Sequence, residues 1–114
     1  MSRGFEIFVD SARRRLSYLK NYLEAARRVK ELVKSRWPEA ETYVFGSVIK
    51  EKYTASSDID ILVILDREPS PDEVADMRAS VYMVMPDASI ELHIVSRRKF
   101  ENWYARFIDE MVKV

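Results

Sequence analysis

Two aspartates, Asp58 and Asp60, stand two positions apart at the start of the most apolar segment of the chain. Side chains at this spacing in a strand point to the same face, so their carboxylates would lie about 6–7 Å apart. Like charges this close are costly to bury unless a cation or a basic group neutralises them. The pair therefore indicates either a metal-binding edge or solvated acids at a frayed strand start that guard against aggregation.

A Gly46-Ser47 pair precedes the aspartates and closes a short β-branched and aromatic run. Glycine lets backbone approach a ligand closely, and free N–H groups at the start of a following helix favour an anion. The alternative is an ordinary strand-to-helix turn. Lys50 and Lys52, which follow, could neutralise phosphate charge or lie on a solvated helix face.

The hydrophobic pattern predicts the elements that must position these residues, in the order α-β-α-β-α-β-α. A strand at 58–65 is apolar on both faces, which indicates a central strand covered on both sides. Ser70 and Ser96 can cap the two helices that follow strands. The predicted elements are a helix at 11–36, a strand at 42–45, two helical turns at 47–53, strands at 58–65 and 89–95, a helix from 70 to about 83, and a final helix from 96.

The connector lengths predict how the strands pair. The eleven residues 47–57 are slightly short for a parallel crossover, so the first two strands should be antiparallel neighbours. The helix-containing connector 67–88 allows the next two strands to run parallel, which brings Glu91 to the edge that holds Asp58 and Asp60. Three carboxylates there suit Mg²⁺ or Mn²⁺ rather than zinc. His93 is expected on the same face as Glu91. It could be a metal neighbour, a base, or a strand side chain without a functional role.

Composition and charge exclude several classes of protein. At 114 residues, with 47% hydrophobic and 33% charged residues, we expect one domain, 1–114, that is neither disordered nor membrane-spanning. No cysteines and one histidine exclude disulfides and a multi-histidine zinc cage. No signal peptide opens the chain, so we expect a cytoplasmic protein. Many charges with few amide side chains resemble a thermophile's composition.

Gly46-Ser47, ten intervening residues, then Asp58-Ile59-Asp60 resembles the signature of the DNA polymerase beta nucleotidyltransferase superfamily. The short length resembles its minimal nucleotidyltransferases, small prokaryotic proteins often encoded beside a HEPN-domain partner. The resemblance implies an α/β nucleotidyltransferase fold, with a small mixed sheet and packed helices, an N-terminal helical region at 1–36 and a catalytic core at 42–114.

The resemblance also assigns roles to residues. Gly46 and Ser47, with Lys50 beside them, would bind the phosphates of a nucleoside triphosphate, with ATP as the expected one. Asp58, Asp60 and Glu91 would be the catalytic and metal-binding carboxylates, with Mg²⁺ or Mn²⁺ as cofactor. The third acidic position is usually aspartate in this family, so the glutamate in Ile90-Glu91-Leu92 is a departure that moves the carboxylate by one methylene.

The implied activity is transfer of a nucleoside monophosphate to an acceptor hydroxyl with release of pyrophosphate, and the resemblance also implies a role as an antitoxin that modifies a HEPN-type partner. One alternative is a non-catalytic antitoxin-like partner. Another is a small RNA-binding domain, because residues 1–36 carry ten Lys/Arg against four Asp/Glu, whereas 37–114 carry nine against fifteen. The C-terminal aromatic stripe exceeds what a small sheet covers, which predicts an interface with a second copy or with the partner; it comprises Phe100, Trp103, Tyr104 and Phe107.

Overall fold

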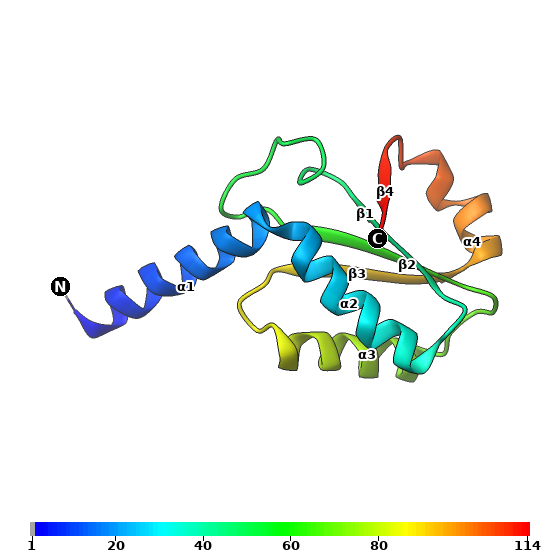
Figure 1. The fold of residues 1–114 in the computed structure, drawn as a ribbon, viewed down its shortest axis with the longest axis horizontal. Coiled ribbons are helices and arrows are strands. Elements are labelled where there is room, and N and C mark those ends of the chain that lie inside the picture. The colour runs from blue at the N-terminus through cyan, green and yellow to red at the C-terminus, as the bar shows by residue number, and fades with distance from the viewer. Residues whose placement is uncertain (1) are drawn as a thin grey trace.

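The central strand of the fold is β2 (Ile59–Leu65), and it is buried along both faces as its apolar pattern predicts. The computed structural model, which describes residues 2–114, places β2 in a four-stranded sheet of order β3-β2-β1-β4 (Figure 1). Strand β1 (Glu41–Phe45) pairs with β2 antiparallel, and β3 (Ile90–Ser96) pairs with β2 parallel. Both pairings confirm the expectation from connector length, and the predicted mixed α/β class is confirmed.

The two faces of β2 belong to two separate hydrophobic clusters. Ile59, Ile61 and Val63 face the larger cluster, which includes buried residues of α2 (Tyr22–Arg36) and α3 (Pro71–Val84). Leu62 and Ile64 face a smaller cluster under α4 (Arg97–Asn102) and the short 3₁₀ helix η1 (Tyr104–Arg106). Asp60 alternates with these residues and therefore lies on the smaller-cluster face.

The expected helix at 11–36 is two helices. The first, α1, spans Arg3–Lys20 and α2 begins at Tyr22, with the break at Asn21, whose backbone leaves the helical region and whose side-chain amide donates to the Ser17 carbonyl. The apolar stripe runs through the break, so periodicity alone did not show it. The N-terminal half of α1 projects from the body of the protein (Figure 1), leaving Phe5 and Phe8 exposed.

Two other predicted helical segments differ from expectation. Residues 46–51 form successive turns instead of helical turns, with positive φ at Gly46 and Glu51. Continuing a right-handed helix through such residues is unfavourable. The final helix is short, because the chain turns back after η1 and adds an edge strand, β4 (Met111–Lys113), antiparallel to β1.

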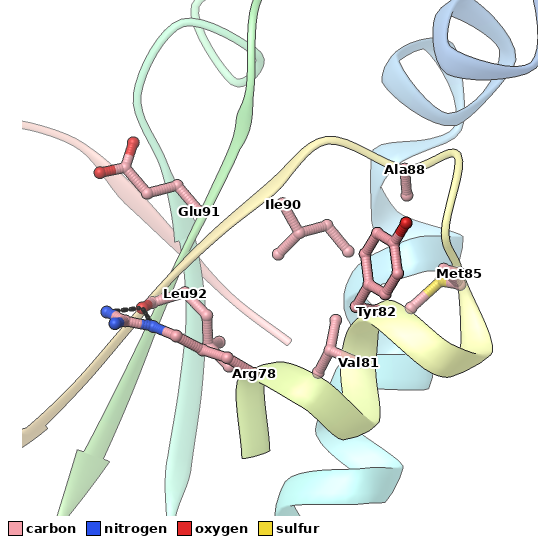
Figure 2. Close-up of a pocket in the computed structure, with 8 residues that line it drawn as sticks. All are labelled: Arg78, Val81, Tyr82, Met85, Ala88, Ile90, Glu91 and Leu92. Carbon is pink, nitrogen blue, oxygen red and sulfur yellow. Dashed lines mark hydrogen bonds between the residues drawn. The ribbon is translucent and has the colours of Figure 1, made fainter. Parts of the chain in front are cut away.

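The crossover helix α3 begins with the predicted cap. Ser70 accepts a hydrogen bond from the Glu73 backbone while the Glu73 side chain accepts one from Ser70 N–H, which is a complete capping box. Farther along α3, Arg78 donates two hydrogen bonds to the Leu92 carbonyl, at 2.9 and 3.2 Å, and so caps part of the open edge of β3 (Figure 2). Within residues 2–114, no helix has the length and apolar character needed to cross a membrane.

Candidate functional site

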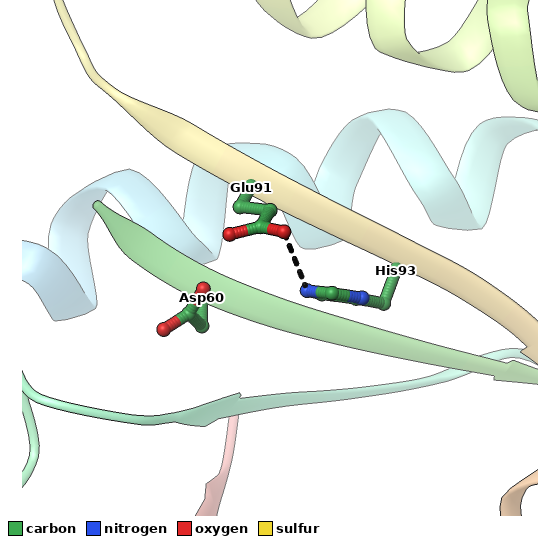
Figure 3. A group of neighbouring side chains, drawn as sticks. All are labelled: Asp60, Glu91 and His93. Carbon is green, nitrogen blue, oxygen red and sulfur yellow. Dashed lines mark ion pairs between the residues drawn. The ribbon is translucent and has the colours of Figure 1, made fainter. Parts of the chain in front are cut away.

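The strand register places the two central carboxylates side by side. Asp60 is the partner of Glu91 across the parallel β2–β3 pair and of Phe45 across the antiparallel β1–β2 pair. Ligand atoms of Asp60, Glu91 and His93 all lie within 4.8 Å of one another (Figure 3). The sequence therefore predicted correctly that Asp60 and Glu91 share one edge of the sheet, and that His93 lies on the same face.

The local charge is unfavourable as it stands. Burial raises the pKa of Asp60 to about 7, and the nearby charges of Glu91 and Asp58 act in the same direction. Burial lowers the pKa of His93 below its usual value, although the negative charge of Glu91 opposes this. His93 Nε2 lies 3.6 Å from Glu91 Oε1, and its ring packs between Phe45 and Tyr104. A neutral imidazole and two acids with too little positive charge form a donor set that a cation would stabilise.

Gly46 forms the opposite wall of this cluster, directly against the Asp60 carboxylate. Its φ is +85°, and a Cβ atom there would collide with Asp60 Oδ2 and lie 3.2 Å from Asp60 Cγ. Both the backbone conformation and the space therefore require glycine. This is the close approach of backbone to the site that the Gly-Ser pair predicted, although the approach is to a carboxylate of the chain itself.

The turn after Gly46 offers unpaired donors. Within residues 2–114, the backbone N–H groups of Ser47, Val48 and Ile49 donate no hydrogen bond and the Ser47 hydroxyl has no partner, although Val48 is fully buried and only Ser47 and Ile49 are open to a ligand. Consecutive free N–H groups in a turn form an anion-binding concavity, so the absence of a helix here does not remove the predicted affinity for phosphate.

Asp58 sits beside the cluster with its carboxylate engaged elsewhere. Its Oδ1 accepts a short hydrogen bond from the Ser89 hydroxyl and lies 3.6 Å from Arg15 Nη2. Asp58, which precedes β2, is therefore absent from the group of side chains whose ligand atoms lie together, and it is half-exposed. The structure brings together Asp60 and Glu91 and leaves Asp58 adjacent.

Lys50 does not point at the carboxylates. Its Nζ lies 2.9 Å from Asp109 Oδ1, in the loop before β4, and this ion pair lowers the pKa of the Asp109 carboxyl. Lys52, the second lysine considered, is exposed and forms no ion pair within the described part of the chain.

An apolar pocket of about 450 Å³ adjoins the cluster, between the C-terminal half of α3 and the edge strand β3. Figure 2 shows Tyr82, Val81 and Met85 on one side of it, with the Glu91 carboxylate directed away from these side chains. Glu91 therefore lines both the pocket and the acidic cluster, but its carboxylate is not directed toward the apolar side chains of the pocket.

Sequence reasoning missed two residues that contact Asp58, namely Arg15 and Ser89. Arg15 belongs to the Arg13-Arg14-Arg15 run, for which the sequence suggested RNA phosphates or a solvated helix face. Its partners lie 41 and 74 positions away, so no local pattern could have identified them.

Comparison with known proteins bears on this arrangement. The profile described as a nucleotidyltransferase domain matches residues 26–113. A crystal structure named provisionally as a nucleotidyltransferase superposes with a TM-score of 0.63 at 25% identity, covering 77% of this chain and 95% of that one. A second crystal structure, of a protein from Sulfolobus solfataricus with the same provisional name, is similar in fold. It has a TM-score of 0.55 at 21% identity and covers 90% of this chain and 85% of that one. No curated protein shows significant sequence similarity.

Proposed function

The chain belongs to the nucleotidyltransferase domain family, and on that premise we propose that it transfers a nucleoside monophosphate from a nucleoside triphosphate, ATP being the expected donor, to an acceptor hydroxyl. The observation that carries the proposal is the pairing of Asp60 with Glu91 across β2 and β3, closed by Gly46. Asp58, Asp60 and Glu91 would hold the divalent cation, Mg²⁺ or Mn²⁺.

In the transfer, the acceptor oxygen forms a bond to the α-phosphorus, and the bond from that phosphorus to the bridging oxygen breaks. Pyrophosphate leaves with the bond electrons, and the acceptor proton passes to solvent or a base. A bound divalent cation would neutralise phosphate charge and lower the pKa of the acceptor hydroxyl. The free N–H groups after Gly46 and the Ser47 hydroxyl would bind the phosphate oxygens.

The raised pKa of Asp60 supports this assignment. A half-buried acid with a pKa of about 7 that faces a second carboxylate is a strained arrangement, and such arrangements occur at functional sites more often than at structural ones. The family's usual aspartate at the third position is glutamate here, and Glu91 nevertheless lies level with Asp60.

Calorimetric titration of ATP with and without Mn²⁺ tests the site, using wild type, Asp60→Asn and, as a surface control, Asp66→Asn in the exposed loop after β2. We expect metal-dependent binding in wild type and in Asp66→Asn, and its loss in Asp60→Asn. Equal affinity in all proteins would refute the site.

Transfer itself is tested with α-labelled ATP and candidate acceptors, including a HEPN-domain protein. Glu91→Gln keeps the length of the side chain but removes its charge, so we expect no transfer, whereas Glu91→Asp should retain it. Transfer by Glu91→Gln at the wild-type rate would show that Glu91 is a bystander.

We propose as a second function that the chain also binds such a partner, as an antitoxin would. Part of the C-terminal aromatic stripe is core, because Phe100 and Tyr104 pack on the sheet. Trp103 and Phe107 are 57% and 70% exposed, with ring centroids 5.6 Å apart. Light scattering of wild type and Trp103→Ala/Phe107→Ala, alone and with the HEPN protein, tests this, and unchanged assembly in the double variant would refute it.

A further inference from the structure

One carboxylate oxygen of Asp58, just before β2, accepts a hydrogen bond from Ser89 and forms an ion pair with Arg15. Arg15, on α1, donates through Nη2 to Ser89 Oγ at 3.0 Å and to the Ser56 carbonyl at 3.3 Å. The same nitrogen lies 3.6 Å from Asp58 Oδ1, and the Ser89 hydroxyl donates to that oxygen as well. Within residues 2–114, no hydrogen bond or ion pair engages Asp58 Oδ2.

We propose that Arg15, acting with Ser89, is a positioning residue of the site. It fixes the rotamer of Asp58 through Oδ1 and leaves Oδ2 for the divalent cation. The proposal rests on the proposed function in one respect, that Asp58 is a ligand of that cation. Hydrogen bonds to the far side of a ligating carboxylate orient it, and their loss typically weakens metal binding about 10–100-fold.

Anchoring of α1 does not by itself explain Arg15, because its neighbour already provides an anchor. Arg14 Nε donates to Asp87 Oδ2 at 2.6 Å, which ties the same helix to the loop before β3 without touching Asp58. Arg15 also has a buried Nε with no hydrogen-bond partner within residues 2–114, which is unfavourable for a donor.

The residue also lies outside the part of the chain that the family profile matches, which begins at residue 26. The helix α1 therefore brings to the site a side chain that the matched domain does not supply. Through Ser56, Asp58 and Ser89, this one guanidinium joins α1 to the loop before β2, the start of β2 and the loop before β3.

The test compares Arg15→Gln with its matched control, Arg14→Gln, by titration of Mn²⁺ followed by electron paramagnetic resonance. We expect Arg15→Gln to lose about 10–100-fold in Mn²⁺ affinity, and Arg14→Gln to stay within twofold of wild type. Ser89→Ala, which removes the hydrogen-bond donor to the same oxygen, should lose affinity in the same direction. Melting curves in EDTA establish that each variant is folded.

A second measurement needs no metal. Side-chain coupling constants of Asp58 in the metal-free protein should indicate one rotamer in wild type and Arg14→Gln, and averaging in Arg15→Gln. A single rotamer retained in Arg15→Gln, or Mn²⁺ affinity within twofold of wild type, would overturn the proposal. If wild type bound no Mn²⁺, or Asp60→Asn bound it equally well, the proposed function would fail, whereas the rotamer comparison would still decide whether Arg15 positions Asp58.

Discussion

Replacing Asp60 with asparagine should stabilise the metal-free protein while destroying its response to metal. The carboxylate is half-buried beside Glu91, which together with burial raises its pKa from 3.8 to about 7. Because the folded-state pKa lies above the unfolded value, the native protein keeps the proton at pH values where the unfolded chain has lost it. The free energy of unfolding therefore falls as the pH rises from about 4 to about 7. Asparagine mimics the protonated form and removes this loss.

The structure sets the size of the effect. A pKa raised from 3.8 to about 7 corresponds to a loss of about 4 kcal/mol in the free energy of unfolding if solvent screening is ignored. The side chain is in partial contact with solvent, and screening reduces the effect to on the order of 1–2 kcal/mol. For a chain of 114 residues this is about 4–8 °C in melting temperature.

Thermal unfolding followed by circular dichroism in EDTA measures this at pH 4 and pH 8. We expect equal melting temperatures for wild type and Asp60→Asn at pH 4, and the variant to be about 4–8 °C more stable at pH 8. Added Mn²⁺ should raise the melting temperature of wild type but not of Asp60→Asn, since a ligand bound only to the native state stabilises it. Asp66→Asn should follow wild type. A variant that melts at or below wild type at pH 8 would refute the reasoning.

Four further substitutions test the scaffold, each by urea denaturation. Gly46→Ala forces a side chain into positive φ and against the Asp60 carboxylate, so it should lose roughly 1–3 kcal/mol and most Mn²⁺ affinity; unchanged affinity would contradict the close approach. Leu62→Ala empties a fully buried position of the central strand and should cost about 2–5 kcal/mol. Ser70→Ala removes one half of the capping box, at the opposite end of β2 from the site, and should cost about 1 kcal/mol without affecting ATP binding. The Arg67–Glu73 pair lowers the pKa of Glu73, so Glu73→Gln should destabilise the protein at pH 7 more than at pH 3, because this contribution is lost as the pH falls; an equal effect at both would argue against the pair.

The sequence predicted those parts of the fold that depend on strong local patterns. Strand β2 is apolar on both faces, and the cap at Ser70 is a local signal within four residues, so both were placed closely. Connector length was enough to predict both strand pairings and hence the meeting of Asp60 with Glu91.

The features that sequence reasoning missed depend on distant contacts. Asn21 carries no breaker signal, yet α1 and α2 part there. Strand β4 is three residues long and exists only because β1 offers it an edge. The contact of Arg15 with Asp58 joins α1 to the start of β2, and an arginine with neighbours Arg13 and Arg14 has no local feature that distinguishes it.

The parallel pairing of β2 with β3 has a consequence for folding kinetics. Asp60 and Glu91 become neighbours only after α3 has formed and crossed over, and such non-local pairings are slow to form. A cation that needs both carboxylates finds no site on the chain before that step. We expect the β2–β3 pairing to form after the folding transition state, so cation binding should slow unfolding and leave the refolding rate nearly unchanged. The metal would stabilise the native state after folding and would not accelerate folding itself.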